Sequence, residues 1–163
     1  MRRSAYSVLV VGLAAIVVLA SSWIAVSGER KGWLTDAPDD ATRWARMEKY
    51  VGGFSTAMAV VGDRFVSVQG ALKDENWQLA RYHWRYLKRA TEQGILRRPK
   101  RAANTNAMFL ETAWPEFDAA LQTADKAVIL SAYEDAAAAC QSCHVAENVD
   151  FMNDQPMFRV ELK

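Results

Sequence analysis

The residues with the richest chemistry stand together near the end of the chain. The run Cys140-Gln141-Ser142-Cys143-His144 holds the only two cysteines and one of the two histidines among 163 residues. Two thiols three positions apart on a helix lie on one face, and an imidazole follows directly. This is the Cys-x-x-Cys-His pattern at which c-type haem is attached. Each thiol bonds one vinyl group of the porphyrin, and a neutral imidazole nitrogen binds the iron. The sequence therefore predicts one covalently attached haem c, held by Cys140, Cys143 and His144, with His144 as the iron ligand.

Three other chemistries use the same side chains. A redox-active Cys-x-x-Cys begins a helix after a strand, whereas the segment Tyr133–Ala139 before this motif is typical of the end of a helix. A zinc site needs four ligands, and the fourth would be the distant His83. A disulfide within one helical turn has awkward geometry. We therefore favour haem over a redox dithiol, zinc or a disulfide.

Composition excludes several classes of function. The formal net charge is +1, which gives no electrostatic basis for binding nucleic acid. The chain has no Gly-rich phosphate loop, no nucleophile elbow, and no second histidine beside an acid that could act as a base. We therefore expect no enzyme and no nucleic-acid partner; any catalysis would be the chemistry of the haem itself.

The first 28 residues (1–28) form a separate apolar segment. Arg2 and Arg3 precede the run Val8–Val26, whose 19 residues approach the length that spans a bilayer. The segment is either a signal peptide cut after Ala20 or a retained membrane anchor, and we favour the anchor because the apolar run continues beyond Ala20. Both interpretations export the body of the protein. We expect it on the periplasmic side of the inner membrane or in the soluble periplasm.

The remaining chain divides into a linker, a haem domain and a tail. Residues 29–40 lack periodicity and predict a linker. Residues 41–152 predict the haem domain, with a first helix that begins at Ala41 and is weakened or bent at Gly52-Gly53. Residues 153–163 predict a C-terminal tail, and we expect irregular structure from residue 148 onward.

Apolar residues recur at spacings of three and four in four stretches of this domain, which is typical of helices packed on one face. These predicted core stripes are Phe54, Met58, Val61, Phe65, Val68 and Leu72; Trp77, Ala80, Trp84 and Leu87; Ala103, Ala107, Leu110, Trp114, Phe117 and Leu121; and Leu130, Tyr133, Ala137, Cys140 and His144. Pro115 predicts a kink near Trp114. Short connections between such helices predict an all-α fold, an antiparallel up-down-up-down four-helix bundle that holds cofactors between facing helices.

This order of parts resembles the cytochrome c′ and cytochrome c-556 group, four-helix bundles with Cys-x-x-Cys-His in the last helix. The chain is more similar still to a set of small exported monohaem cytochromes. The shared elements are Met58-x-x-x-Gly62-x-Arg64-Phe65, Asn76-Trp77-x-Leu79-Ala80-x-Tyr82 and Arg98-Pro99-x-Arg101. The resemblance covers residues 47–151. It implies haem binding, export, and either electron transfer or binding of a small gas.

The second axial position on the iron has several candidates. The resemblance places an axial methionine at Met58, and a thioether ligand gives a six-coordinate electron carrier with a raised potential. The plainer alternative is that Met58 fills the core. His83 lies beside its stripe, so we expect a partnered histidine rather than a ligand. Met108, Met152 and Met157 are weaker candidates.

Basic residues offer contacts to the haem propionates or to an acidic partner. Arg64 stands next to Asp63, and the segment Arg97–Arg101 is strongly basic. The plainer interpretation of both is solvated charge. The sequence alone does not choose between these roles.

We expect a monohaem c-type cytochrome that carries single electrons outside the cytoplasm. One alternative is a five-coordinate cytochrome c′-like binder of nitric oxide or carbon monoxide, with Met58 as a steric gate. Another is a haem subunit of a membrane complex. The expected partners are a redox protein and, if residues 1–28 are retained, the membrane; a homodimer is left open.

Overall fold

A computed structural model describes residues 32–162, and within that range the fold is all-helical and has no strand. The apolar segment 1–28, with the choice between signal peptide and anchor, lies outside the described residues. Among the helices of the described range, none is both long enough and apolar enough to cross a membrane. The chain divides into two compact units, one up to Tyr50 and one from Val51 onward.

The described part of the first unit is a turn followed by an exposed helix. The helix α2 (Asp40–Val51) begins where the Asp39 carboxylate accepts a hydrogen bond from the Thr42 backbone N–H at 2.6 Å, the role of an N-cap residue. Arg46 pairs with Asp36 at 2.9 Å and so ties the helix to the preceding turn. No residue of α2 is buried, so local contacts of this kind hold the helix.

The glycine pair separates two helices. Gly52 has a φ of +76°, a conformation that costs glycine little and other residues more. A Cβ atom at this position would lie 2.1 Å from the Thr56 hydroxyl oxygen. The next helix begins at Phe54, so the predicted weakening at Gly52-Gly53 is a complete break.

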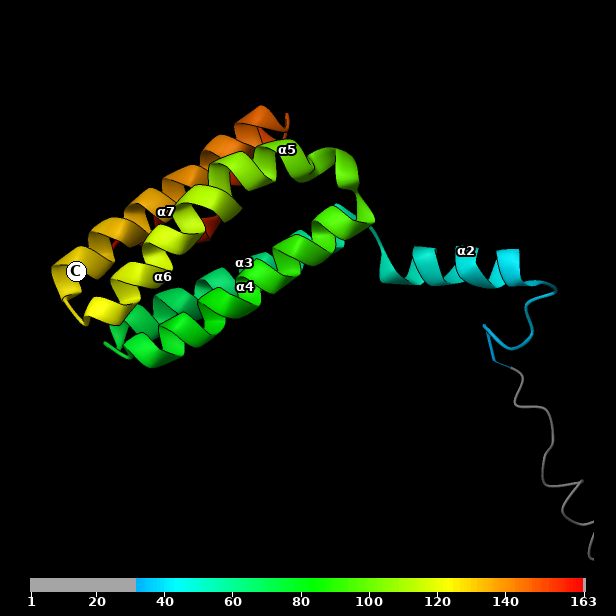
Figure 1. The fold of residues 1–163 in the computed structure, drawn as a ribbon, viewed down its shortest axis with the longest axis horizontal. Helices are drawn as coiled ribbons and strands as arrows, with labels where there is room; N and C mark the ends of the chain where they lie inside the picture. Colours follow the sequence, from blue (N-terminus) through cyan, green and yellow to red (C-terminus); the bar gives the residue numbers. More distant parts are fainter. Residues whose placement is uncertain (1–31, 163) are drawn as a thin grey trace, which may run out of the picture. The chain divides into compact units, whose positions relative to one another are not determined.

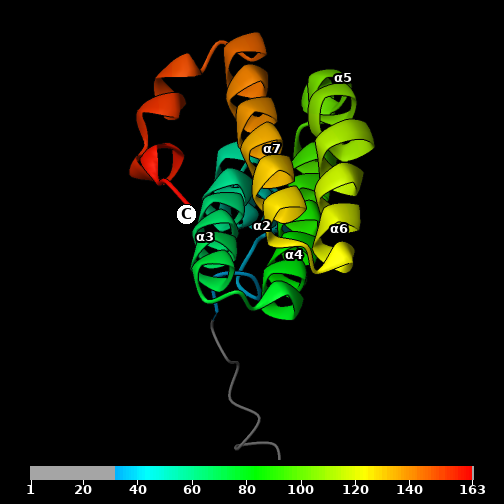
Figure 2. The same cartoon turned by 90° about the vertical axis from the view of Figure 1, so that its left-hand side faces the viewer.

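Four long helical segments make up the second unit. They are α3 (Phe54–Lys73), α4 (Trp77–Arg97), a composite segment and α7 (Lys126–Ala146); the composite segment runs through η1 (Pro99–Arg101), α5 (Ala102–Thr105), η2 (Asn106–Ala113) and α6 (Trp114–Thr123). In Figure 1, α3 and α4 form one layer, and the composite segment with α7 forms the other. The helices α3 and α7 run in opposite directions, as both views show (Figure 2).

Capping residues define the short connections between the segments. The Asn76 side chain accepts a hydrogen bond from the Leu79 N–H at 3.0 Å and starts α4. The Asp125 carboxylate accepts two backbone hydrogen bonds and starts α7. Both caps satisfy N–H groups that a helix leaves unpaired at its first turn. The connections are therefore tight, and consecutive segments pack against each other.

The predicted core stripes of α3 and α4 are confirmed in part, because Phe54, Met58, Val61 and Trp77 are only half-buried. Phe65, Val68 and Leu72 of α3 are buried, and so are Ala80, Trp84 and Leu87 of α4. Trp84 is fully buried, and its indole N–H donates to the Trp114 carbonyl oxygen at 3.0 Å. Trp114 returns the bond, its indole N–H donating to the Trp84 carbonyl oxygen at 3.3 Å. Both indole N–H groups are therefore hydrogen-bonded, so neither destabilises the core as an unpaired donor would.

The predicted stripe of the third segment is wrong in its first half. Ala103 and Ala107 are exposed, and the buried positions of this stretch are Thr105, Phe109 and Ala113. The reason is that η2 is a π-helix. Its i→i+5 bonds put more residues into each turn than an α-helix does, so side chains four positions apart stay on one face. A stripe drawn with α-helical spacing therefore falls out of register here.

Pro115 occupies the first turn of α6, directly after the π-helix. A proline in the first turn lacks an N–H that would be unpaired there in any case. The irregularity expected near Trp114 thus takes the form of a π-helix that ends at Ala113.

The C-terminal segment is ordered, and the prediction of irregular structure from residue 148 onward is wrong. It forms two 3-10 turns, η3 (Asp150–Asp154) and η4 (Pro156–Arg159). Asn148 has a φ of +57°, and the Val149 N–H donates to the His144 carbonyl oxygen at 2.9 Å. This left-handed cap ends α7 and reverses the chain. The segment then returns beside α7 and α3 (Figure 2).

Candidate functional site

Cys140, Cys143 and His144 lie in the last two turns of α7, at the end where that helix meets the returning C-terminal segment. Both cysteines are free and half-buried. Cys140 packs against the hydrophobic core cluster that includes Tyr133 and Ala136. Side chains three or four positions apart on a helix share a face. The motif is therefore presented at the edge of an apolar core.

Burial raises the pKa of both thiols. Burial, followed by the neighbouring Cys143, raises the pKa of Cys140 to about 12. Burial also raises the pKa of Cys143, although Thr105 and Arg101 act in the opposite direction. A redox-active dithiol needs one cysteine with a lowered pKa, usually at a helix N-terminus. Raised pKa values at the C-terminal end of α7 argue against that chemistry.

The zinc alternative has no fourth ligand in the described part of the chain. Among residues 32–162, no group of three or more His, Cys, Asp and Glu side chains is placed to hold a metal ion. The Nδ1 atom of His83 instead lies 3.3 Å from an Arg64 guanidinium nitrogen. His83 is thus a partnered histidine between α4 and α3, as its place beside the stripe predicted.

The His144 ring is oriented by a side chain of the C-terminal segment. Its Nδ1 atom lies 2.8 Å from the amide oxygen of Asn153. The amide nitrogen of Asn153 donates to the Gln141 carbonyl oxygen at 3.2 Å, which requires the amide oxygen to face the ring. Nδ1 must then carry the hydrogen, because an amide oxygen only accepts. In the neutral form of the ring, the lone pair is then on Nε2.

A polar cluster closes the end of the site. Arg101 forms an ion pair with the Glu147 carboxylate and donates to the Glu147 carbonyl oxygen at 3.1 Å. The Asn104 amide donates to the same carboxylate at 2.8 Å. These contacts join the start of the composite segment to the end of α7, next to Cys143. Arg101, expected to meet a propionate, an acidic partner or solvent, has an internal partner.

Met58 lies at the level of the motif on the opposite helix. Phe65 of α3 stacks on Tyr133 of α7 with ring centroids 5.3 Å apart. The two helices are antiparallel, so seven residues before Phe65 and seven after Tyr133, about two turns each, bring Met58 and Cys140 to the same height. Met58 is half-buried. This placement suits either a distal ligand or a core side chain.

Met157, a weaker candidate by sequence, packs against the core and approaches α3 near Met58. A Cβ atom built on Gly62 would lie 3.2 Å from the Met157 methyl carbon. Gly62 is one helical turn after Met58 on α3. The glycine therefore lets η4 approach this helix closely and brings a second thioether to the region.

The C-terminal segment supplies the site residues that sequence reasoning missed. Asn153 contacts His144, and Phe158 lies edge-on to the His144 ring with centroids 5.9 Å apart. Two signals were available: an asparagine just after a helix end favours a left-handed cap, and Met157 and Phe158 are apolar residues in a tail read as irregular. Neither feature predicts that the C-terminal segment packs on α7 and α3.

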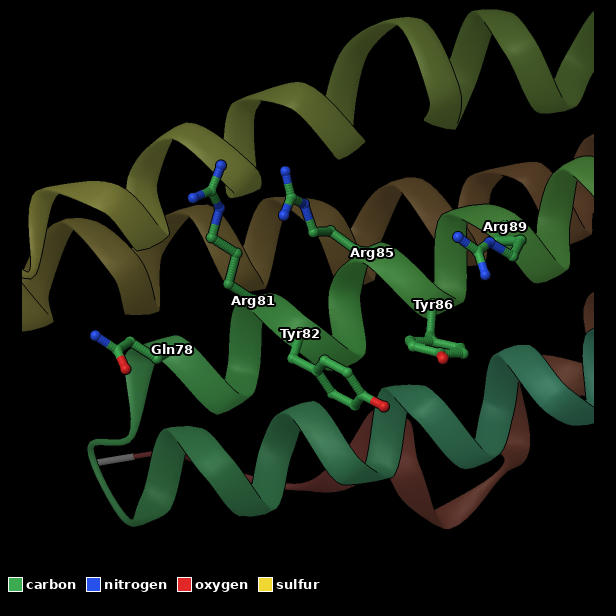
Figure 3. A pocket seen from close by; sticks show the side chains of 6 residues that line it. All are labelled: Gln78, Arg81, Tyr82, Arg85, Tyr86 and Arg89. Atoms are coloured by element: carbon green, nitrogen blue, oxygen red, sulfur yellow. The ribbon is translucent and has the colours of Figure 1, made fainter.

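A surface hollow of about 400 Å³ lies elsewhere, on the outer face of α4 (Figure 3). Its lining residues all come from that one helix: Gln78, Arg81, Tyr82, Arg85, Tyr86 and Arg89. Arg81 is already paired with Asp118 through two hydrogen bonds of 2.9 Å. The hollow contains no residue of α7 and no part of the motif.

Comparisons with protein-family models, with curated proteins and with solved structures find no match to this chain. The resemblance to small monohaem cytochromes therefore stays a prediction, and the functional argument rests on the site itself.

The residues present fit a covalently attached haem. Two free thiols and an imidazole stand on one helical face beside an apolar core. The imidazole hydrogen is committed to Asn153 on one side, so the opposite nitrogen is available to iron. Ligating histidines commonly donate their other N–H in this way. Two thiols and one oriented imidazole are the groups that a covalently attached haem would require.

Proposed function

We propose that this chain is a monohaem c-type cytochrome that carries single electrons outside the cytoplasm. The observation that carries the proposal is the His144 ring, held through Nδ1 by Asn153 beside the free thiols of Cys140 and Cys143 on α7. We further infer that the second unit is an antiparallel up-down-up-down four-helix bundle. The N-terminal segment would serve as signal peptide or membrane anchor.

In this proposal the chain contributes attachment, orientation and exclusion of water. Cys140 and Cys143 would hold the haem through two thioether bonds, and His144 would bind the iron through Nε2. The haem, when bound, supplies a one-electron ferric–ferrous couple, whose potential depends on axial ligands and burial. The apolar core beside Cys140 lowers the local polarity, and a redox partner protein would exchange the electron.

Binding of carbon monoxide distinguishes the electron-carrier hypothesis from the gas-binder hypothesis. A six-coordinate iron with Met58 as distal ligand has no free position, so the reduced full-length protein should resist carbon monoxide. Met58→Ala should open the site and allow rapid uptake, seen in the visible spectrum. Met157→Ala is the comparison variant, because the Met157 side chain of η4 approaches α3 at Gly62, about one turn from Met58, and offers the other nearby thioether.

The outcomes are distinct. Rapid uptake of carbon monoxide by the reduced, unmodified protein would contradict the electron-carrier hypothesis and favour the five-coordinate gas binder. A spectrum that changes in Met157→Ala but not in Met58→Ala would move the distal ligand to Met157.

A further inference from the structure

The strongest feature outside the motif is the bridge that Asn153 forms across it. Its amide oxygen lies 2.8 Å from Nδ1 of His144, and its amide nitrogen donates to the Gln141 carbonyl oxygen at 3.2 Å. Both partners belong to the Cys-x-x-Cys-His run, although Asn153 is nine residues beyond the histidine. The Asn153 side chain thus contacts both the His144 ring and the backbone of the motif, and these two contacts fix the orientation of the ring.

The segment that delivers Asn153 is itself fixed at several points. The Gln69 amide nitrogen of α3 donates to the Met157 carbonyl oxygen at 2.6 Å. Phe158 packs against Phe65, with ring centroids 5.7 Å apart, and edge-on against His144. At the other end, the Val149 N–H is bonded to the His144 carbonyl oxygen. The position of Asn153 is therefore set by tertiary contacts on both sides of it.

We propose that Asn153 is a positioning residue that fixes the tautomer and the orientation of His144 from the C-terminal segment. The inference rests on the proposed haem function for its consequence, but the contact itself concerns only the protein. A hydrogen-bond acceptor at Nδ1 orients a ligating imidazole and increases its basicity as a ligand. A neutral amide accepts less strongly than a carboxylate does. Asn153 would therefore give His144 an intermediate donor strength.

If Asn153 has this role, two substitutions at this position should shift the reduction potential of the haem in opposite directions. Asn153→Leu removes the acceptor, weakens the imidazole as a donor to ferric iron, and should raise the reduction potential. Asn153→Asp places a charged acceptor at Nδ1, stabilises ferric iron, and should lower the potential. Gln155→Ala is the matched control, because Gln155 lies on the same segment and its amide nitrogen donates locally, to the Met152 carbonyl oxygen at 3.2 Å.

Potentiometric titration of the full-length haem protein tests these shifts. The expected result is an ordered series, with Asn153→Leu highest, the unmodified protein and Gln155→Ala equal, and Asn153→Asp lowest. A purely structural role would move Asn153→Leu and Asn153→Asp in the same direction, and that result would overturn the proposal. If Asn153→Leu does not fold, the sign of the shift in Asn153→Asp decides.

A second readout does not need haem. In the full-length chain with Cys140→Ala and Cys143→Ala, ¹⁵N-labelled histidine reports which ring nitrogen of His144 carries the hydrogen. We expect hydrogen on Nδ1, and loss of that preference in Asn153→Leu but not in Gln155→Ala. A tautomer that ignores Asn153 would overturn the inference. If the tautomer depends on Asn153 but the chain with both cysteines intact never acquires haem in a competent host, the proposed function alone is refuted.

Discussion

At the residue scale, the half-buried contact between His83 and Arg64 favours the neutral form of the imidazole. Its Nδ1 atom lies 3.3 Å from an Arg64 guanidinium nitrogen. Burial, followed by the positive charge of Arg64, lowers the pKa of His83 from its usual 6.5. The fold therefore holds the neutral imidazole, which can accept a hydrogen bond from the guanidinium. An imidazole with this partner is poorly suited to bind iron.

This contact gives the fold a dependence on pH. Because the folded-state pKa is lowered, the stability that His83 contributes is present above 6.5, its unfolded value, and is lost as pH falls through the folded pKa. We predict that the free energy of unfolding declines below pH 6.5, and that His83→Gln removes this part of the decline. Urea unfolding at a series of pH values from 7.5 to 5 measures it. Coincident curves for the two proteins would contradict the assignment.

The Cys-x-x-Cys-His motif is visible in the sequence, but the contact between Asn153 and His144 could not be predicted from it. Cys140, Cys143 and His144 form a local pattern in the sequence, and the haem site that it predicts stays a prediction. Asn153 reaches His144 only because the chain reverses at Asn148 and η4 then packs on α3. That contact depends on tertiary structure, which no local pattern contains.

At the scale of the helices, the close approach of α3 and α4 depends on Gly94. A Cβ atom on Gly94 would lie 3.0 Å from the Ala57 Cβ atom and 3.1 Å from the Phe54 ring. Gly70, also helical, has no atom within 4 Å of a Cβ built there. The same substitution should therefore have opposite effects at the two positions.

We predict that Gly94→Leu lowers the free energy of unfolding by about 1–3 kcal/mol through overpacking. Gly70→Leu, the control, should raise it by roughly 0.5–1 kcal/mol, because leucine favours the helix over glycine. Chemical denaturation of both variants gives the comparison. Equal effects would show that α3 and α4 are not as close as the structure places them.

The helices also show where sequence periodicity succeeds and where it fails. In the second half of α3 and in the middle of α4 the α-helical repeat is regular, so apolar spacing correctly placed Phe65, Val68 and Leu72 and likewise Ala80, Trp84 and Leu87 in the core. In the third segment the π-helix η2 changes the number of residues per turn. Spacing alone therefore placed Ala103 and Ala107 inside, where Thr105 and Phe109 are found.

At the scale of the whole chain, every residue proposed to hold the haem belongs to the second compact unit. The first unit, with α2, contributes none of them. The apolar residues 1–28 would then act only in export or anchoring. The proposed haem attachment thus involves residues of the second unit alone. Electron transfer, the role of Met58 and the effect of Asn153 on potential all depend on this proposal.

Covalent haem on the denatured chain tests that claim most directly. The full-length protein, matured in a host that attaches c-type haem, is denatured and digested, and the peptide containing residues 140–144 is weighed by mass spectrometry. We predict that this peptide carries one haem through both sulfur atoms, and that a variant with Cys140→Ser and Cys143→Ser carries none. A colourless protein in which both thiols react with an alkylating reagent would contradict the account.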